Sequence, residues 1–451
     1  MKTKSTLLQT WMPFVMRSAP KHTRLLCFVS VWLAHSSVHS ADLLSLTKVA
    51  GDGGGVRLTW TNVIGHAYLI QTRQRLERDD WLPLLSLTSD SNRALWADEA
   101  APRPSLFYRL VDLGNTNWCS RLQTALGNAR TSQGAKGVSA VVIATNGIWQ
   151  GTSGLSDATN TNGVQPQMRF SIGSITKTFT AALIMQLAEE GKLSVDDPLS
   201  TWLPDYPNIT NTITIRQLLS HTSGVYNFTE NPAYWPMVSE TNQIYTPQDT
   251  LALVQAPDFL PGQGFHYSNT GFILLGLIAE SATHAPVASE IRRRFLDPLE
   301  LRTVYMEGAE PASGQRAHGF SYNYTNHLED ISARAWWVEY PVAWAAGAMT
   351  STSYEVAQWV GALYGGRVLQ PTSIEQMTNC TTLSISSGLP YGLGTMRFST
   401  ARGDFWGHRG RITGYAALAA YSPSRKTTVA VLVNQDAVDI DAIWLALVNA
   451  L

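Results

Sequence analysis

The chain has 451 residues, of which 44% are hydrophobic and 15% are charged, with 33 basic against 34 acidic side chains and a formal net charge of -1. This composition predicts folded domains rather than long disordered segments. The balanced charge argues against a nucleic-acid partner, because such proteins carry a basic surplus that neutralises phosphates. The length suits up to three domains, or one large domain with a small one.

The N-terminus has the layout of a secretory signal peptide. Basic residues at 21–24 precede an apolar run at 25–34 (LLCFVSVWLA), and residues 38–40 (VHS) end the segment. The run is shorter than the ~20 residues that span a bilayer. A buried strand or helix is the alternative. The pattern predicts that residues 1–40 are a signal peptide and that the mature protein is periplasmic or secreted, without a transmembrane anchor.

The cysteines leave two possibilities open. Cys119 and Cys380 lie in the predicted mature chain. Export permits a disulfide between them, but two cysteines so far apart could equally be separate buried thiols. No group of cysteines and histidines has zinc-ligand spacing. The sequence therefore implies no metal and no organic cofactor.

Residues 41–114 are predicted to form a small all-β domain. Residues 56–60 (VRLTW) alternate as a half-buried strand does, and residues 67–72 and 107–111 supply further strands. Glycine- and proline-rich turns separate them. Short strands at this spacing resemble a fibronectin type III sandwich. The domain is either a structural spacer or an accessory that contacts the cell wall or a glycan.

Residues 115–451 are predicted to form one larger unit. It opens with a helix from residue 117 and a hairpin around Asn146-Gly147. A helix begins near Ser174, and the middle of the unit is mostly helical. The expected later elements are strands at 391–398, 405–410, 415–421 and 427–433 and a helix at 440–451. Hairpins at both ends with helices between them predict a sheet whose strands come from both ends of the unit.

One short motif places a nucleophile beside a base. Ser174 and Lys177 stand at positions i and i+3 of the predicted helix, which share a face. Serine needs a neighbouring base, a partly desolvated lysine can lose its proton, and the N–H groups of a helix start favour an oxyanion. A helix cap beside a surface lysine gives the same pattern, so this motif alone is weak.

Two further motifs follow along the chain. In Tyr267-Ser268-Asn269, the tyrosine could shuttle a proton, and Asn269 could orient the lysine or bind a substrate amide. In His408-Arg409-Gly410, the glycine lets a substrate backbone approach, and His408 would supply a donor or a cation. Taken singly, each motif also fits a purely structural role.

In this order, the three motifs resemble those of the serine β-lactamase and penicillin-binding superfamily. The Tyr-x-Asn and His-x-Gly forms are similar to class C β-lactamases and above all to Streptomyces-type D-alanyl-D-alanine carboxypeptidases and related esterases. Blocks typical of that family lie at 170–177 (FSIGSITK), 215–224 (IRQLLSHTSG), 267–275 (YSNTGFILL), 346–351 (AGAMTS) and 391–394 (YGLG). The resemblance covers about residues 115–451. It implies a β-lactamase/transpeptidase-like α/β (α+β) domain with an antiparallel sheet and a helical subdomain.

The resemblance also implies residue roles. Ser174 would be the nucleophile that forms an acyl-enzyme. Lys177 and Tyr267 would handle the proton transfers, with Tyr267 acting toward the leaving group and water. Asn269 would contact Lys177 and the substrate, and His408 would assist Tyr267 electrostatically.

The backbone N–H groups of Ser174 and Arg411 would form the oxyanion hole, on the same reasoning.

One position departs from the family pattern, because the third motif has Arg409 where the family has a Thr or Ser that binds a carboxylate. An arginine can bind a carboxylate strongly, but on a strand both arginines could also point away from the pocket or fill it. Trp344 is predicted to form part of the pocket wall.

The sequence thus predicts an exported serine hydrolase for a small-molecule or peptide substrate. A D-alanyl peptide, a β-lactam and an ester all fit, because their hydrolysis shares this chemistry and differs in the shape of the pocket. One alternative is a catalytically weak penicillin-binding or sensor protein with the same fold. Another is an adhesion module whose main function lies in the β domain.

Overall fold

The structure is a computed structural model, which describes residues 117–451 apart from 146, 160, 240–244, 333–338, 381 and 384–387. Before residue 117 it describes the backbone of seven short strands. These are β1 (Val31–Leu33), β2 (Ser45–Lys48), β3 (Val56–Thr61), β4 (Ala67–Arg73), β5 (Leu82–Thr88), β6 (Arg93–Asp98) and β7 (Phe107–Gly114).

The N-terminal strands form two groups. β2, β3 and β6 pair in a three-stranded antiparallel sheet, and β7, β4 and β5 pair antiparallel in that order. β5 also pairs in parallel with β9 (Gly147–Gly154), so the second group continues the sheet of the larger unit. β1 lies within the predicted signal peptide and pairs with β7, while the rest of residues 1–40 falls outside the described part of the chain. The signal peptide and the separate β domain at 41–114 therefore stay predictions.

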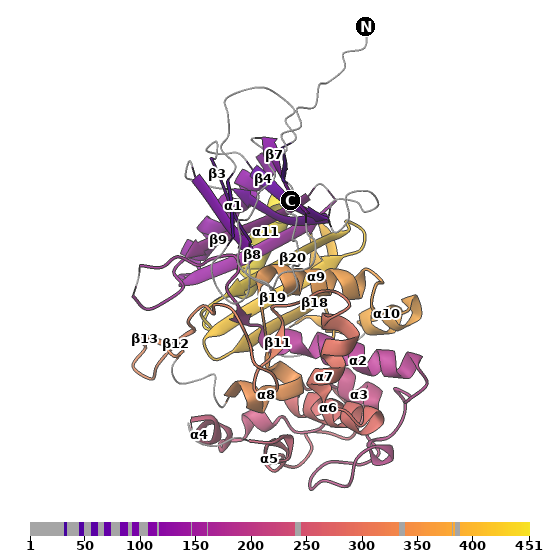
Figure 1. The fold of residues 1–451 in the computed structure, drawn as a ribbon. Coiled ribbons are helices and arrows are strands. Elements are labelled where there is room, and N and C mark those ends of the chain that lie inside the picture. Colours follow the sequence, from indigo (N-terminus) through magenta and orange to yellow (C-terminus); the bar gives the residue numbers. More distant parts are fainter. Residues whose placement is uncertain are drawn as a thin grey trace, which may run out of the picture.

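One antiparallel sheet forms the centre of the larger unit (Figure 1). Its strands in spatial order are β9 (Gly147–Gly154), β8 (Gly137–Ala144), β20 (Thr427–Val433), β19 (Tyr415–Ser422), β18 (Gly403–Ile412), β17 (Met396–Thr400), β16 (Pro390–Tyr391) and β15 (Thr382–Leu383). The purple strand β8 pairs with the yellow strand β20, so both ends of the unit meet in one sheet. The sheet predicted from hairpins at both ends is confirmed.

Helices cover both faces of this sheet and build a helical part beside it (Figure 1). The α-helices are α1 (Asn117–Ser132), α2 (Thr176–Glu189), α3 (Ile215–Leu219), α4 (Tyr234–Ser239), α5 (Pro247–Leu251), α6 (Asn269–Thr283), α7 (Val287–Ile291), α8 (Glu339–Gly347), α9 (Ser353–Tyr364), α10 (Pro371–Thr378) and α11 (Ile440–Ala450). α1 and α11 pack together on one face, and α9 packs on the other. α2, α6 and α8 pack against one another in the helical part.

The remaining elements are short turns of helix and small sheets. The short helices are η1 (Gly173–Ile175), η2 (Leu199–Thr201), η3 (Phe228–Glu230) and η4 (Arg292–Leu296). The small sheets contain β10 (Phe170–Ser171), β14 (Met349–Ser351) and β11 (Tyr305–Met306), and β12 (Phe320–Tyr322) with β13 (Leu328–Asp330).

The sheet has a buried core on each face, which explains the sequence of β20. Val429 and Val431 enter the core below α1 and α11, whereas Ala430 and Leu432 enter the larger core on the opposite face. A strand that is covered on both faces is apolar throughout and does not alternate. β20 is buried along its whole length accordingly.

The predicted strand at 391–398 is two strands in the structure. Between β16 and β17, the chain turns with a hydrogen bond from the Gly392 N–H to the Thr395 carbonyl oxygen at 2.8 Å. Gly394 has a φ of +65°, a conformation that glycine adopts readily. Its N–H donates to the carbonyl oxygen of Leu219 at 2.9 Å. This contact ties the edge of the sheet to the helical part, and no local sequence pattern announces it.

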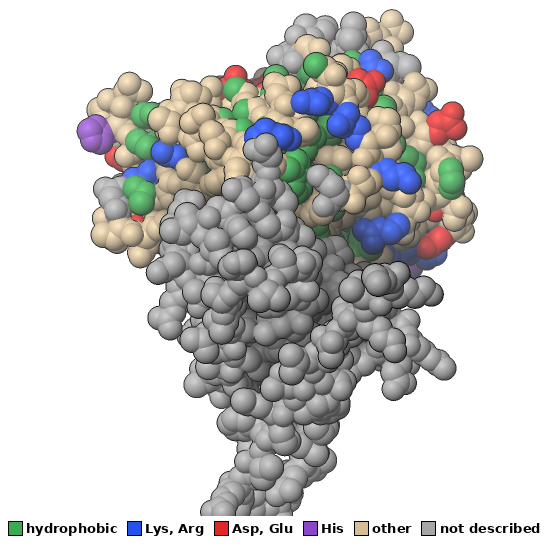
Figure 2. Space-filling model, turned by 90° about the horizontal axis from the view of Figure 1, so that it is seen from above, with side chains coloured by type: hydrophobic (Ala, Val, Ile, Leu, Met, Phe, Trp, Pro, Cys, Tyr) green, Lys and Arg blue, Asp and Glu red, His purple; other side chains and the backbone are tan. Residues whose placement is uncertain are grey.

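Charged side chains of both signs are scattered over the described part of the face in Figure 2. Among the described residues, no group of three or more His, Cys, Asp or Glu could hold a metal ion. No single described helix is long and apolar enough to cross a membrane, although α6 and the helical segment after it pass that test together, with a bend of 76°. Cys119 and Cys380 are not bonded to each other.

Candidate active site

Ser174 lies where a tight turn meets the sheet. It belongs to η1, which runs directly into α2. Gly173 has a φ of +49°, and a Cβ built there would lie 2.8 Å from the Arg411 nitrogen; one built on Gly410 would lie 1.8 Å from the Ile172 carbonyl oxygen. The turn and β18 can therefore touch only because both residues are glycines. The backbone nitrogens of Ser174 and Arg411 flank this contact, as an oxyanion hole requires.

Lys177 is fully buried, one helical turn after Ser174. Its Nζ lies 3.0 Å from Ser174 Oγ and donates hydrogen bonds to Asn269 Oδ1 and to the Ala346 carbonyl oxygen, each at 2.7 Å. Burial lowers the pKa of Lys177 well below its usual value. A neutral amine has two N–H groups and one lone pair, so the two acceptors leave the lone pair for the Ser174 hydroxyl. The geometry suits a general base beside its nucleophile.

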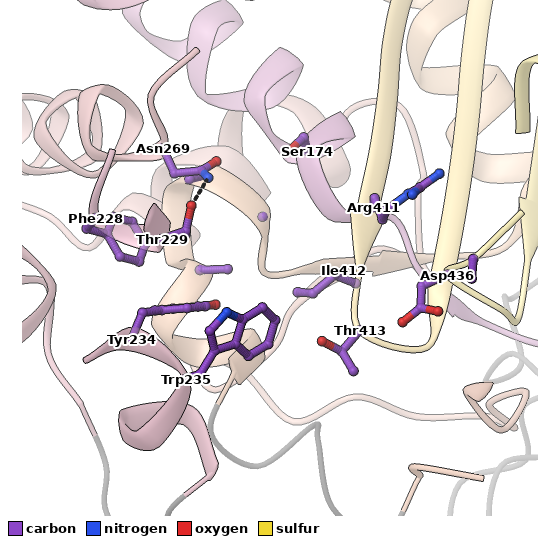
Figure 3. Close-up of a pocket in the computed structure, with 14 residues that line it drawn as sticks. Ser174, Phe228, Thr229, Tyr234, Trp235, Asn269, Arg411, Ile412, Thr413 and Asp436 are labelled. Carbon is purple, nitrogen blue, oxygen red and sulfur yellow. Dashed lines mark hydrogen bonds between the residues drawn. The ribbon is translucent and has the colours of Figure 1, made fainter. Parts of the chain in front are cut away.

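Asn269 is oriented by residues that the sequence analysis did not single out. Its Nδ2 donates to Thr229 Oγ1 at 3.3 Å, which Figure 3 shows as a dashed line. Its backbone N–H and Nδ2 both donate to Asn227 Oδ1. These bonds turn Oδ1 toward Lys177. Asn227 and Thr229 belong to none of the three motifs, and only the fold brings their loop against the start of α6.

Tyr267 reaches the nucleophile from the loop before α6. Its side chain lies beside that of Ser174 in the same cavity, and its ring centroid lies 5.0 Å from Lys177 Nζ. Burial raises the pKa of Tyr267, which keeps the hydroxyl protonated and suits a proton donor to a leaving group. The buried His221 packs its ring 4.2 Å from the Tyr267 ring, and its Nδ1 accepts the Ser268 N–H at 3.2 Å. His221 lies in the 215–224 block, where the sequence indicated no role for it.

His408 is neutral in this environment. It is fully buried, and burial lowers its pKa to about 3. Its Nδ1 contacts the Arg409 carbonyl oxygen, and its Nε2 lies 2.9 Å from the Tyr391 hydroxyl. Nδ1 therefore carries the proton, and Nε2 accepts from Tyr391. The structure thus places a neutral imidazole, and not a cation, beside Tyr267, at a ring distance of 6.3 Å.

Two cavities meet at Ser174. The first, of about 400 Å³, is lined on one side by Phe228, Tyr234 and Trp235 and on the other by β18 (Figure 3). We call it the aromatic half; its lining residues are Ser174, Phe228, Thr229, Tyr234, Trp235, Asn269, Ala343, Ala346, Gly347, Arg411, Ile412, Thr413, Asp436 and Ala437.

The second cavity, of about 690 Å³, lies between Tyr267, β18 and the start of α11. We call it the charged half; its lining residues are Ser174, Tyr267, Asn269, Met396, His408, Arg409, Gly410, Arg411, Ala437, Val438, Asp439, Ile440 and Asp441. Ser174, Asn269, Arg411 and Ala437 line both halves. The nucleophile therefore stands between two differently built surfaces.

The side chains of Arg409 and Arg411, in and just after the third motif, bind different partners. Arg409 lines the charged half, and its Nη1 donates to Asp441 Oδ2 at 2.7 Å. Arg411 is exposed, and its Nη2 donates to the Val438 carbonyl oxygen at 3.0 Å. The Arg409 side chain therefore lies in the groove. Its guanidinium is already bound there by the carboxylate of Asp441.

Trp344 lies outside the groove, in contrast to the prediction from sequence. Its neighbours Ala343 and Ala346 line the aromatic half, but Trp344 is not among the described residues that line either cavity. Trp344 has a φ of +35°, which interrupts the helical conformation of α8. Its ring packs on Gly276 of α6, where a built Cβ would lie 2.7 Å from the ring. Trp235, from another segment, lines the groove instead.

Comparisons with known proteins agree with this site. The β-lactamase family model matches residues 122–449. A D-stereospecific amidohydrolase from Streptomyces sp. is 31% identical, with a TM-score of 0.65 over 72% of this chain and 96% of that one. A D-amino acid amidase from Ochrobactrum anthropi SV3 is 22% identical, with a TM-score of 0.68 over 74% of this chain and 99% of that one, and supports the fold.

Curated relatives extend the comparison. Penicillin-binding protein 4* of Bacillus subtilis (strain 168) is 26% identical over 297 residues, which are 62% of this chain and 64% of that one. The chain spans less than two thirds of the length of this relative and of other curated relatives that it matches. The family match over most of the chain and the shared fold confirm the resemblance seen in the motifs. The chain belongs to the β-lactamase family, a family of serine hydrolases with penicillin-binding and amidohydrolase members.

Proposed function

We propose that the protein hydrolyses an amide or ester of a D-amino acid through an acyl-enzyme on Ser174. The observation that carries the proposal is the buried Lys177 amine, 3.0 Å from Ser174 Oγ, with its two other neighbours both hydrogen-bond acceptors. The 31% identity to a D-stereospecific amidohydrolase supports the choice of substrate.

Acylation follows from the positions of the groups. Lys177 takes the Ser174 proton while Oγ attacks the substrate carbonyl carbon, and the N–H groups of Ser174 and Arg411 stabilise the oxyanion. The bond to the leaving group then breaks, and Tyr267 gives its proton to the departing nitrogen or oxygen. The lysine is now an ammonium and the tyrosine a phenolate, and the two charges stabilise each other.

Deacylation returns both protons. The Tyr267 phenolate takes a proton from water as the water oxygen attacks the acyl carbon. The bond to Ser174 Oγ breaks, and the Lys177 ammonium returns its proton to Oγ. Each residue then regains its starting protonation state, so no other acid or base is required.

The two halves of the groove bind different parts of the substrate. Tyr267 protonates the leaving group and lines the charged half, so the leaving group lies there. The acyl group then extends into the aromatic half, between Trp235 and β18.

Intact-mass spectrometry of the purified chain tests the proposal. The chain is incubated in parallel with a p-nitrophenyl ester, a D-aminoacyl amide and a β-lactam, alongside Ser174→Ala. We expect hydrolysis of the ester and the amide that Ser174→Ala abolishes. A persistent β-lactam adduct without turnover would instead indicate a catalytically weak penicillin-binding or sensor protein. If no reagent gives a Ser174-dependent signal, the proposal is wrong.

The place of action is part of this proposal. The signal-peptide pattern supports export to the periplasm or beyond, and the β domain at 41–114 would contact the cell wall or a glycan. N-terminal sequencing of the mature chain tests export, with cleavage near residue 40 expected. Deleting residues 41–114 tests the β domain, and glycan binding that survives the deletion would exclude that role.

A further inference from the structure

We propose that Asp441 determines which leaving groups the site accepts. By occupying Arg409, it excludes substrates that carry a carboxylate next to the scissile bond and favours neutral leaving groups, such as an amide or an uncharged alcohol. This inference rests on the proposed function, because it concerns the leaving group of the same reaction.

The ion pair stands inside the site. Arg409 Nη1 and Asp441 Oδ2 are 2.7 Å apart, and both residues line the cavity that holds Ser174 and Tyr267. Arg409 Nη2 and Asp441 Oδ1 are shielded from solvent and find no hydrogen-bond partner among the described residues. A guanidinium binds a carboxylate through such a contact. Asp441 thus stands where the carboxylate of a substrate would bind Arg409.

The charges that line this half cancel. Arg409 and Arg411 contribute two positive charges, and Asp439 and Asp441 contribute two negative charges. A substrate carboxylate in this cavity therefore meets no surplus of positive charge. It also meets two carboxylates that repel it, which selects against anionic leaving groups.

The position of Asp441 is set by a well-packed helix. Asp441 lies in the first turn of α11, whose N-cap, Asp439, accepts the Ala442 N–H at 3.0 Å. α11 packs on α1 and on the central sheet, with Ile443 and Leu447 fully buried. A substrate carboxylate could displace Asp441 only by leaving that carboxylate, whose side chain is 43% exposed, without its cation and beside the like charge of Asp439.

A matched pair of esters tests the inference on the full chain. N-acetyl-D-alanyl-D-lactate and its D-lactamide counterpart differ only in the carboxylate of the leaving group. The released D-lactate or D-lactamide is measured by chromatography. We expect the wild type to prefer the lactamide in kcat/KM by roughly tenfold, and Asp441→Asn to shift the preference toward the lactate by roughly tenfold or more.

Control variants isolate the pair. Asp404→Asn removes a carboxylate from the same strand, β18, outside both cavities, and should leave the preference unchanged. Asp441→Asn combined with Arg409→Gln should not show the shift in preference toward the lactate ester, because that shift requires a free guanidinium. Asp441→Ser serves as a second variant if Asp441→Asn does not fold.

The outcomes separate this inference from the proposed function. A wild type that prefers the lactate, or an Asp441→Asn variant that behaves as Asp404→Asn does, would overturn the inference. If p-nitrophenyl ester hydrolysis is Ser174-dependent in the same preparation, the proposed function survives that result. If that hydrolysis is absent, the proposed function itself fails.

Discussion

The two halves of the groove share one nucleophile but are built in different ways. The aromatic half takes its outer wall from η3 and α4, two short elements, and Trp235 in that wall is 58% exposed. The charged half is formed by β18 and α11, which belong to the central sheet and its covering helix. The difference teaches that the reacting groups Ser174 and Lys177 lie at the junction of the two halves, while each half can set its own selectivity.

The junction also differs from both halves in its burial. Lys177 is fully buried, and the oxygens of Asn269 and Ala346 hold its amine. A charge is strongly disfavoured in such a place, so the junction sets the protonation state of the catalytic groups. The walls of the groove other than Tyr267 then act on binding rather than on the chemistry.

The largest effect should follow from Lys177→Met, which removes the base that serves both halves. We expect kcat to fall by roughly 10³-fold or more for every substrate, because Ser174 is then not activated. The thermal midpoint should change little, because the loss of two hydrogen bonds offsets the removed cost of burying an amine. Steady-state kinetics and thermal melts measure both effects.

Lys192→Met is the matched control, since Lys192 is a surface lysine paired with Glu190. It should leave kcat unchanged. A loss in Lys177→Met that depends strongly on the leaving group would contradict the view that the base belongs to the junction.

Tyr267→Phe should act mainly on the charged half. An amide substrate needs a proton on its leaving nitrogen, so we expect its kcat to fall by roughly 10²- to 10³-fold. A p-nitrophenyl ester releases a stable anion and should lose much less. Parallel kinetics on both substrates measure the difference, with Tyr324→Phe at a fully exposed position as the control. Equal losses on both substrates would remove Tyr267 from the role of proton donor.

Trp235→Ala should act on the aromatic half alone. We expect kcat/KM to fall by roughly tenfold for esters with an aromatic acyl group and little for acetyl esters, because the indole supplies apolar contact area. The lactate-to-lactamide preference should not change. Leu260→Ala, at an exposed apolar position outside both cavities, is the control. A changed leaving-group preference would show that the two halves are not independent.

The smallest effect concerns the pH dependence of the free energy of unfolding, which depends on the buried histidines His408 and His221. Burial lowers the pKa of His408 to about 3 and that of His221 well below its usual value. Below pH ~6.5 the unfolded chain binds protons at these residues and the folded chain does not. The contribution of these two histidines to the free energy of unfolding should therefore fall as the pH drops from 7 to 5.5, by at most about 1.4 kcal/mol per pH unit for each group. Above pH ~7 neither histidine should contribute a slope. His266, whose pKa is raised beside Asp258 and Glu230 despite its partial burial, contributes a slope of the opposite sign.

Urea denaturation at the two pH values measures this slope. His408→Gln should reduce it, because the variant lacks one of the two titrating groups. A slope that is unchanged in the variant would mean that His408 is not held neutral by its burial.

Sequence reasoning found the elements whose signals are local. The hairpin of β8 and β9 and the helical segment from Ser174 onward are set by neighbours in the chain, and both form where the patterns indicate. The break between β16 and β17 was missed, because it depends on Leu219 from a distant helix. Trp344 was misplaced for a similar reason, since its backbone conformation departs from that of the surrounding helix.

The sequence by itself indicated that Ser174 and Lys177 could meet, because residues three apart in a helical segment share a face. It also determined the order of the motifs and hence the family. Only the tertiary structure decided that Lys177 is desolvated, that His408 is neutral and that Arg409 is paired with Asp441. These properties depend on burial and on contacts with residues distant in the chain, and the neighbouring sequence indicates neither the burial nor the contacts.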